Sequence, residues 1–506
     1  MKLTNSAQMR LSDRHVIEDL GIPGTELMAA AARHIADAAR ARRKEGAIAA
    51  FCGTGNNGGD GIGAAAYLLQ EGAAVRVFLI GNPESLTPDS REMLRLLESH
   101  GGAVETFDSA HDIVGYLRGC DVIIDAMFGT GLNSDVRGDA LLAVEMINES
   151  AAYVIAADMP SGVCADTGRI LGAAVSADLT VTFSLPKAGQ FLEPGCVCAG
   201  DLHVCDIGVP QEVLRDLPAY ADAVLPDEIA LPRRNPNTHK GDYGRCLIIA
   251  GSVGYTGAPT LCARAASRCG AGLVAVGVPQ RIYDITAAKL DEEMPFPLPD
   301  DGSGRLSIAA LDAIVSRAAE CDAMVIGPGL SRSPGITELV AAVLKLVTIP
   351  VILDADGINA ISGNIDILDN AAGPVILTPH PGEFMRLGGD LSGGNRLGPA
   401  REFAVAHNVI TVLKGHRTIS AMPDGSAYIN TTGGPAMAKG GSGDVLAGMI
   451  AALIGQKFPL KDSVLAAVCI HGYAGDKCAD EYGVYSPVAG DIINMLPMAA
   501  KLFTER

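Results

Sequence analysis

The chain has 506 residues, which is enough for roughly two to four domains of ordinary size. Hydrophobic residues make up 48% of it and charged residues 19%, a balance that excludes a disordered chain. The formal net charge of −19 argues against nucleic acid or an anionic membrane as a partner, because both attract basic surfaces. A phosphate-bearing small molecule stays possible, since backbone N–H groups bind phosphate without any lysine.

The 12 cysteines include no Cys-x-x-Cys pair, and the closest two are Cys196 and Cys198. This spacing favours buried thiols in a reducing compartment over a zinc site or a disulfide framework. The N-terminal sequence lacks the apolar run of a signal peptide, and no uninterrupted apolar stretch reaches the length of about 20 residues that spans a membrane. We therefore expect a cytoplasmic protein that binds neither membrane nor nucleic acid, and we expect a homo-oligomer.

Short apolar runs alternate with helical stretches up to about residue 210. This alternation predicts βαβ units, and hence a mainly parallel sheet with helices on both faces. An Ala-rich helix is expected over 27–43, and strands are expected at 47–53, 74–81, 121–129, 152–160, 179–186 and 202–210. We predict an α/β domain over residues 1–215.

Residues 211–236 are rich in proline and mixed charge, which predicts a linker or the entry into a second domain. The alternation of strands and helices then resumes, so we predict a second α/β domain over residues 225–506. Its strands are expected at 245–251, 271–279, 322–329, 350–356, 374–380 and 409–415, before a long helical tail from Asp444.

A glycine-rich loop, GTGNNGGDGIG, spans residues 53–63 between a predicted strand and a predicted helix. It contains Gly53-x-Gly55-x-x-Gly58, the spacing of a dinucleotide-binding turn. The strand that follows ends without an acidic residue for a ribose, which disfavours a plain dehydrogenase. The oxygen atoms of Asn56, Asn57 and Asp60 suit a hard cation, although a tight turn with polar capping would also explain them.

Two more polar loops follow predicted strands. Asp125 begins DAMFGTGL at 125–132, and Asp158 begins DMPSGV at 158–163. Either aspartate alone could be a helix cap. Because the carboxyl ends of parallel strands meet at one edge of a sheet, the three loops together predict a ligand site.

GNNGGDG, DAMFGTGL and DMPSGV together resemble the NAD(P)H-hydrate epimerase domain, the amino-terminal half of bacterial bifunctional NAD(P)H-hydrate repair enzymes. The resemblance covers about residues 1–210 and implies a Rossmann-like three-layer fold and a potassium ion held by Asn57, Asp125 and Ser161. The family commonly has Glu-Asn-Ala-Gly in its first helix, where this chain has Ala29–Ala32. The substrate contacts that the resemblance implies are Asn56, Asn57, Gly58, Gly59, Asp60, Gly129, Thr130, Gly131, Leu132, Asn133, Ser134, Asp135 and Asp158.

The substrate of such a domain is a hydrated NADH or NADPH with a hydroxyl on C6, next to ring nitrogen N1. This stereocentre can invert through a planar or a ring-opened intermediate. The reaction needs a carboxylate that moves a proton and a site that holds the charged parts of the substrate still. We predict Asp158 as the catalytic carboxylate, with Asp125 occupied by the cation.

The second block has no GxxxxGK[ST] signature, which excludes a P-loop NTPase. Its most informative element is Gly440–Asp444, a glycine-rich turn that enters an apolar helix. Such a turn presents free N–H groups to an anion, and an aspartate at the helix start can accept a hydroxyl proton. Asp354 and Asp356 could bind magnesium, or Asp354 could be a structural carboxylate.

GGSGD resembles the anion-binding turn of ribokinase-like folds. Together with SVGYTGAP, GPGL, LDADGIN, TPHPGEF and LKG, it resembles the ADP- or ATP-dependent NAD(P)H-hydrate dehydratase domain over about residues 225–506. The resemblance implies substrate contacts at Ala258, Gly329, His380 and Asp444. It implies nucleotide contacts at Lys414, Gly415, His416, Arg417, Thr418 and Gly443.

The implied reaction makes the C6 hydroxyl a good leaving group by phosphorylating it, with Asp444 as the base toward that hydroxyl. ADP or ATP would be the phosphoryl donor, with Mg²⁺ in this half, and the fused domains favour ADP. One alternative is a ribokinase-like small-molecule kinase with a regulatory nucleotide-binding first module. Another is a non-catalytic interaction scaffold, for which Ala29–Ala32 is the only supporting feature.

Overall fold

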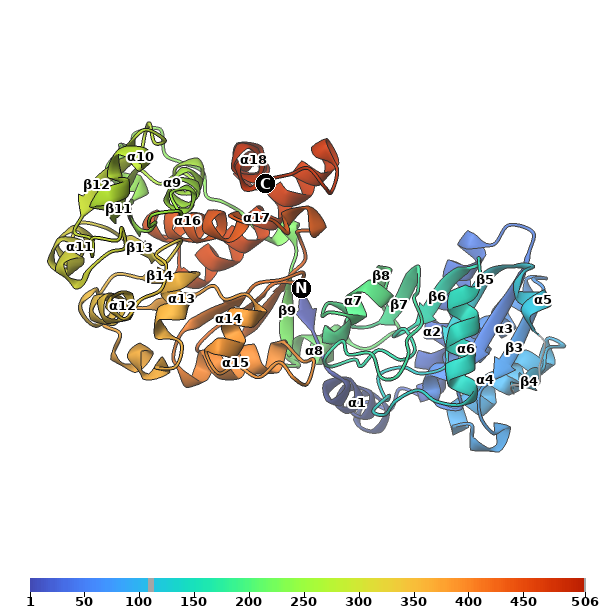
Figure 1. Cartoon of the computed structure of the whole chain (residues 1–506). Helices are drawn as coiled ribbons and strands as arrows, with labels where there is room; N and C mark the ends of the chain where they lie inside the picture. Colours follow the sequence, from blue (N-terminus) through green and yellow to red (C-terminus); the bar gives the residue numbers. More distant parts are fainter. Residues whose placement is uncertain (108–112, 505–506) are drawn as a thin grey trace. The chain divides into compact units, whose positions relative to one another are not determined.

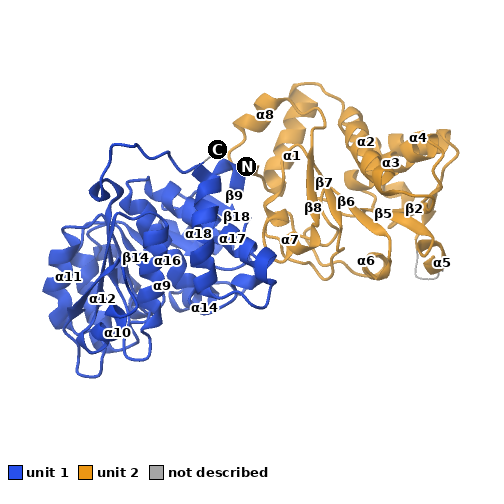
Figure 2. Ribbon diagram, turned by 90° about the horizontal axis from the view of Figure 1, so that it is seen from above, with its two compact units in different colours: residues 1, 223–506 blue, residues 2–222 orange. Residues whose placement is uncertain are grey.

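The computed structural model describes residues 1–107 and 113–504, which divide into two compact units. Unit 2 is Lys2–Asp222, and unit 1 is Met1 together with Ala223–Arg506 (Figure 2). Both units are α/β, as the sequence predicted. In the described part of the chain, no helix combines the length and the apolar character needed to cross a membrane.

Unit 2 is built on a sheet of seven strands in the order β4-β3-β2-β5-β6-β7-β8 (Figure 1). All of its strand pairs are parallel. The strands are β2 (Ala47–Cys52), β3 (Val75–Leu79), β4 (Val104–Thr106), β5 (Cys120–Ala126), β6 (Tyr153–Ala157), β7 (Leu179–Phe183) and β8 (Asp201–Cys205). The chain builds outward from β2 to β4 and returns to the other side of β2 with β5. The order therefore reverses at β2 and β5, which is where ligands bind in open α/β sheets.

Helices cover both faces of this sheet, as expected for a three-layer Rossmann-like fold. Alternate residues of β2 point to opposite faces: Ile48 and Ala50 join one apolar core, whereas Ala49 and Phe51 join the other. The first core also takes residues of α2 (Gly24–Arg42), α3 (Asn56–Gln70) and α4 (Pro88–Ser99), and the second those of α5 (Val114–Leu117) and α6 (Asp139–Glu149). The remaining helices of unit 2 are α1 (Ser6–Arg14), the short π-helix His15–Asp19, α7 (Gly195–Cys198) and α8 (Gln211–Asp216).

Unit 1 contains a longer sheet in the order β9-β18-β17-β16-β15-β14-β13-β10-β11-β12. From β16 to β12 the strand pairs are parallel, and the β16-β17-β18 meander is antiparallel. The strands are β9 (Ala221–Val224), β10 (Arg245–Ile249), β11 (Leu273–Pro279), β12 (Met294–Leu298), β13 (Ala323–Ile326), β14 (Val351–Leu353), β15 (Val375–Leu377), β16 (Ile410–Leu413), β17 (Ile419–Ala421) and β18 (Ala427–Asn430). Here the order reverses between β10 and β13.

One face of this sheet packs against α9 (Gly257–Arg268), α16 (Ser442–Gly455), α17 (Leu460–Tyr482) and α18 (Ala489–Thr504) in a single apolar core. The predicted helical tail is thus three helices rather than one, because Pro459 and Gly483 interrupt it. The other helices are α10 (Tyr283–Ala287), α11 (Leu311–Ala318), α12 (Pro334–Leu346), α13 (Asp356–Ile361), α14 (Pro381–Arg386) and α15 (Leu397–Ala406).

The segment predicted as a linker, 211–236, is partly ordered secondary structure. It contains α8 and β9, and β9 pairs with the N-terminal strand β1 (Lys2–Leu3) in antiparallel register. Local composition did not show this strand, because its four residues lie between prolines and its partners are distant in sequence.

Candidate active sites

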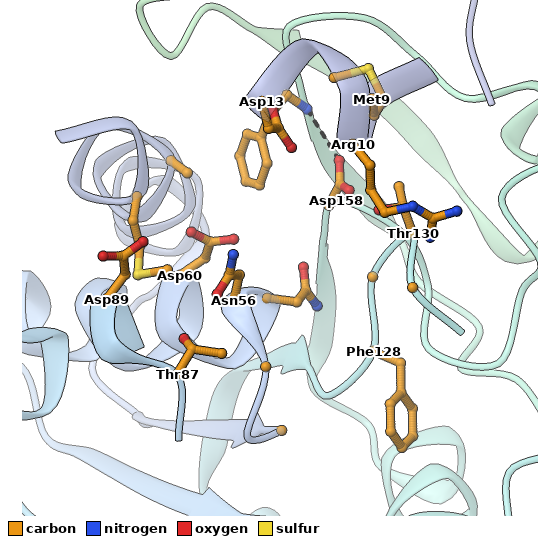
Figure 3. A pocket seen from close by; sticks show the side chains of 18 of the residues that line it. Met9, Arg10, Asp13, Asn56, Asp60, Thr87, Asp89, Phe128, Thr130 and Asp158 are labelled. Atoms are coloured by element: carbon orange, nitrogen blue, oxygen red, sulfur yellow. Dashed lines mark hydrogen bonds between the residues drawn. The ribbon is translucent and has the colours of Figure 1, made fainter. Parts of the chain in front are cut away.

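Unit 2 has a cavity of about 690 Å³ at the carboxyl ends of its central strands, where the strand order reverses (Figure 3). Most of the predicted substrate contacts lie in its wall. These are Asn56, Asn57, Asp60, Gly129, Thr130, Gly131, Leu132, Asn133 and Asp158. The three loops that the sequence singled out therefore come together at one site.

Four predicted contacts are absent from the wall of this cavity. Asp135 is half exposed and accepts a 3.4 Å hydrogen bond from Arg137, and Ser134 lies beside it in the sequence. Gly58 and Gly59 instead allow close packing of α3. A Cβ on Gly58 would overlap the carbonyl oxygen of Gly53, and one on Gly59 would lie 2.6 Å from the sulfur of Met28.

Asp125 and Ser161, two of the residues implied in potassium binding, are in direct contact. The Asp125 carboxylate is fully buried and accepts hydrogen bonds from the Ser161 backbone N–H at 2.7 Å and from its hydroxyl at 2.6 Å. Burial raises the pKa of Asp125 to about 6, although the Ser161 hydrogen bonds oppose this. Both amide atoms of Asn57 are buried and have no hydrogen-bond partner among the described residues. A buried amide oxygen without a hydrogen-bond partner suits a cation.

Asp158 lies at the end of β6 and forms an ion pair with Lys187, a residue that sequence reasoning missed. The Lys187 side chain is 2% exposed, and its ammonium also donates to the Thr182 hydroxyl at 3.0 Å and to the Phe183 carbonyl at 3.2 Å. Asp158 adopts a left-handed backbone conformation with φ 62°, held by a 2.7 Å hydrogen bond from Gln190 to its carbonyl. The ion pair thus fixes one oxygen of Asp158 at the cavity wall.

Two further carboxyl groups, Asp13 and Asp60, also line this cavity. Burial raises the pKa of Asp13 to about 6, while Lys187 lowers it and Asp158 raises it. Burial also raises the pKa of Asp60 well above its usual value, and Asp158 and Asp13 add to the shift. Burial and mutual repulsion thus favour the protonated forms of Asp13 and Asp60 more than in an ordinary aspartate.

The Ala29–Ala32 departure has a limited effect on this cavity. Of the four alanines, only Ala31 lies in its wall. Ala32 is buried, and its methyl group would lie 2.8 Å from a Cβ on Gly63 of α3. Ala32 thus packs α2 against α3.

In unit 1, Asp444 lies in the first turn of α16, directly after the glycine-rich turn. Gly441 has φ 94°, a conformation that favours glycine. A Cβ on Gly443 would lie 3.0 Å from the Lys414 ammonium and 3.8 Å from a carboxylate oxygen of Asp354. The turn, the lysine and the two aspartates thus form one cluster.

Charges in this cluster determine the state of Asp444. Lys414 forms a 2.8 Å ion pair with Asp354, which also accepts a 2.7 Å hydrogen bond from the Thr378 hydroxyl. Burial raises the pKa of Asp444 to about 7; Asp354 adds to the shift and Lys414 opposes it. A carboxyl group that titrates near neutral pH suits general acid–base catalysis.

A cavity of about 720 Å³ lies beside this cluster. The predicted nucleotide contacts in its wall are Lys414, Gly415, His416, Thr418 and Gly443. Arg417 is not in the wall; its guanidinium donates to the Thr431 carbonyl at 3.1 Å. His380 lines the cavity and caps α14, because its Nδ1 accepts from the backbone N–H groups of Gly382 and Glu383 at 3.0 and 3.3 Å.

The last two predicted substrate contacts, Ala258 and Gly329, are neighbours outside this wall. The Ala258 methyl group would lie 3.1 Å from a Cβ on Gly329, which has φ 65°. Asp356, the other candidate magnesium ligand, accepts a 2.8 Å hydrogen bond from the Ser331 backbone N–H.

Sequence reasoning missed three charged or polar residues in these sites. Lys187 follows the strand run LTVTFSLP, and a lysine directly after a buried strand was an available signal. Asp13 lies on an ordinary polar helix, so no local pattern marked it. His471 is buried on α17, 3.3 Å from the Ser442 hydroxyl, and burial lowers its pKa to about 4.

Comparisons with known proteins divide the chain at the same place. A family model described as NAD(P)H-hydrate dehydratase matches residues 246–498, and one described as YjeF-related protein N-terminus matches residues 24–189. The bifunctional NAD(P)H-hydrate repair enzyme Nnr of Moorella thermoacetica is 41% identical over 100% of this chain and 98% of its own length. The protein of the same name from Thermofilum pendens is 38% identical over 100% of this chain and 97% of its own.

A solved structure, a ribokinase-like superfamily protein from Enterococcus faecalis, is similar to part of the chain. It is 26% identical, covers 56% of this chain and 97% of its own, and has a TM-score of 0.50. This likeness supports the ribokinase-like fold that GGSGD implied.

Proposed function

The chain belongs to the family of bifunctional NAD(P)H-hydrate repair enzymes, and from this premise we propose how its two units divide the repair. Unit 2 interconverts the R and S forms of hydrated NADH or NADPH at C6. Unit 1 dehydrates the S form with ADP or ATP, which gives NADH or NADPH, AMP or ADP, and phosphate. The observation that carries this proposal is the presence, in each unit, of a cavity with a lysine–aspartate ion pair beside a carboxyl group of raised pKa.

In unit 2, Asp158 is the base that takes the proton of the C6 hydroxyl. The Lys187 ammonium pairs with this carboxylate and holds its position. The backbone of Gly129–Asn133 and the side chain of Asn56 surround the substrate and restrict its rotation.

The residues that would hold a potassium ion in unit 2 are Asn57, Asp125 and Ser161. They fit such an ion because the Asn57 amide is buried without a partner and Asp125 is the only carboxylate of the three. A single carboxylate with neutral oxygens suits a monovalent cation better than Mg²⁺, which demands a small octahedral site. The bound ion would supply positive charge that orders the Asn56–Asp60 turn.

In unit 1, Asp444 takes the proton of the C6 hydroxyl while the phosphoryl group is transferred to the oxygen of that hydroxyl. The free backbone N–H groups in the first turn of α16, which follows Gly441, would stabilise the developing phosphoryl charge. The ring nitrogen N1 then expels phosphate, and loss of the C5 proton restores the dihydronicotinamide.

The nucleotide would occupy the cavity of about 720 Å³, with its phosphates toward Lys414 and Gly443. A magnesium ion would be held by Asp354 together with phosphate oxygens, since the second carboxylate oxygen of Asp354 faces Gly443. The bound metal would neutralise phosphate charge.

The test is to incubate the full chain with hydrated NADH and ADP, and in parallel with ATP. We expect NADH and phosphate to appear in equal amounts, and no phosphorylated product to accumulate. A phosphorylated product without restored NADH would support the alternative, a ribokinase-like kinase.

A further inference from the structure

Asp13 is a carboxyl group in the wall of the unit 2 cavity that the mechanism above does not use. It belongs to α1, which precedes residue 24, where the match to the family model begins. Figure 3 shows the side chains of Asp13, on α1, and Asp158, after β6, facing the same space. The residue thus lies beside the reacting group without belonging to any of the recognised loops.

Helix α1 is fixed in place, so the position of Asp13 is defined. Its N-cap Asn5 forms a reciprocal capping box with Gln8. Ser6 anchors the first turn through its backbone N–H and its hydroxyl, which donate to Asp166 at 2.6 and 3.1 Å. Met9 and Ser12 are buried, and the next turn buries Val16 against Leu27 of α2.

Asp13 and Asp158 differ in their surroundings. The Lys187 ammonium and the Thr182 hydroxyl hold the Asp158 carboxylate in place. The carboxyl group of Asp13 accepts no hydrogen bond from any other described residue, and Asp13 is only partly exposed. Burial raises its pKa to about 6, so that it keeps its proton more readily than an ordinary aspartate.

We propose that Asp13 is a second catalytic residue of the epimerase site, the acid that protonates ring nitrogen N1 while Asp158 takes the hydroxyl proton. This inference rests on the proposed function of unit 2.

The two groups make ring opening balanced in protons and electrons. Asp158 removes the proton of the C6 hydroxyl, and the C6–oxygen bond becomes a carbonyl. The C6–N1 bond breaks with its electron pair on N1, which takes the proton of Asp13. After rotation about the C5–C6 bond, N1 attacks the other face of the carbonyl and both protons return. Neither an oxidant nor any other reactant is needed.

The charged groups that line the cavity with Asp13 come from five elements. Lys187 and Asp158 follow β7 and β6, Asp60 lies on α3, Asp89 lies on α4, and Arg10 is one turn away on α1. Because the acid must be protonated, kcat for epimerisation should fall as the pH rises through the pKa of Asp13. The Asp13→Asn variant cannot show this decline.

The experiment measures interconversion of the R and S forms by the full chain, without nucleotide. Asp13→Asn should lower kcat about 100-fold or more, the lower end of general acid–base contributions, and change KM less than about threefold. Asp13→Glu should retain more activity than Asp13→Asn. The matched control is Asp19→Asn, which removes an exposed carboxylate paired only with His15 on the same segment.

Thermal unfolding and the KM for epimerisation report on the fold of unit 2 in every variant, and dehydration of the pure S form checks that unit 1 is intact. If wild type does not interconvert the epimers, the proposed function of unit 2 fails. If wild type does so and Asp13→Asn keeps kcat within about threefold, whatever the change in KM, the catalytic role of Asp13 is overturned. Retention of the alkaline decline in Asp13→Asn would overturn it equally.

Discussion

At the scale of single residues, both sites contain a lysine–aspartate ion pair next to a second aspartate with a raised pKa. Lys187 pairs with Asp158 in unit 2, and Lys414 pairs with Asp354 in unit 1. The neighbouring Asp13 and Asp444 have their pKa values raised by burial, to about 6 and about 7. Each site thus contains one carboxylate that is ion-paired with a lysine and one carboxyl group whose pKa burial raises toward neutral pH.

We expect Asp444→Asn to remove dehydration while leaving epimerisation intact. The amide keeps the size of the side chain but cannot accept the hydroxyl proton, so kcat for NADH release should fall by at least about 100-fold. The assay follows NADH from the S epimer with ADP. Asp462→Asn, at an exposed position in the first turn of α17, should change nothing. Restoration of NADH at near wild-type rate would show that Asp444 is not the base.

The same substitution should stabilise unit 1 at alkaline pH. The pKa of Asp444 is raised in the folded state, so the folded protein holds this proton more tightly than the unfolded chain. The stability that this gives is fully present below the unfolded pKa and is lost as the pH rises through about 7. Asp444→Asn avoids this cost. Its Tm should exceed that of wild type by about 2 °C or more at pH 8, and the difference should shrink toward pH 4. A difference that is constant with pH would mean that ionisation of Asp444 is not the cause.

At the scale of elements, the sequence predicted the strands that have buried apolar runs, such as β2, β5 and β10, and the loops that follow them. It missed β12, whose Pro295 and Pro297 argue against a strand and are tolerated because β12 is at a sheet edge. It also missed the β17–β18 hairpin, whose strands are too short to show a period. Of the unit 2 site, the loops were predictable from their position after strands, whereas Asp13 was not, because only the tertiary fold brings α1 to the cavity.

The first turn of helix α3 requires a glycine at position 58. A Cβ there would overlap the Gly53 carbonyl oxygen, whereas one on Gly55 meets nothing within 4 Å. Gly58→Ala should therefore destabilise unit 2 by about 1–3 kcal/mol and reduce epimerisation, and Gly55→Ala should do so much less. Thermal unfolding and epimerisation assays of both variants test this. Equal effects of the two substitutions would contradict the packing role of Gly58.

At the scale of the whole molecule, each unit has its own sheet and core, and the family matches divide in the same way. We expect residues 1–218 to fold and epimerise alone, and residues 219–506 to fold and dehydrate the S epimer alone. The second fragment keeps β9, which pairs with β18 and whose Val224 carbonyl accepts a 2.7 Å hydrogen bond from Thr431.

A fragment that begins at Pro226 provides the control for this cut. It lacks β9 and exposes the β18 edge, so its Tm should be lower than that of the 219–506 fragment. Insolubility of both halves in every version would contradict the independence of the units. The homo-oligomeric state stays a prediction, which sedimentation of the full chain would test.

The most direct test of the account starts from the pure R epimer of hydrated NADH with ADP, and follows absorbance of the restored NADH. Wild type should restore NADH because unit 2 supplies the S form to unit 1. With Asp158→Asn, R should be consumed only at the slow spontaneous rate of epimerisation. Asp444→Asn should convert R into S without releasing NADH. Two results would contradict the division of the repair between the two units. One is that Asp158→Asn restores NADH from the R epimer at the wild-type rate. The other is that wild type restores NADH from the S epimer but not from the R epimer.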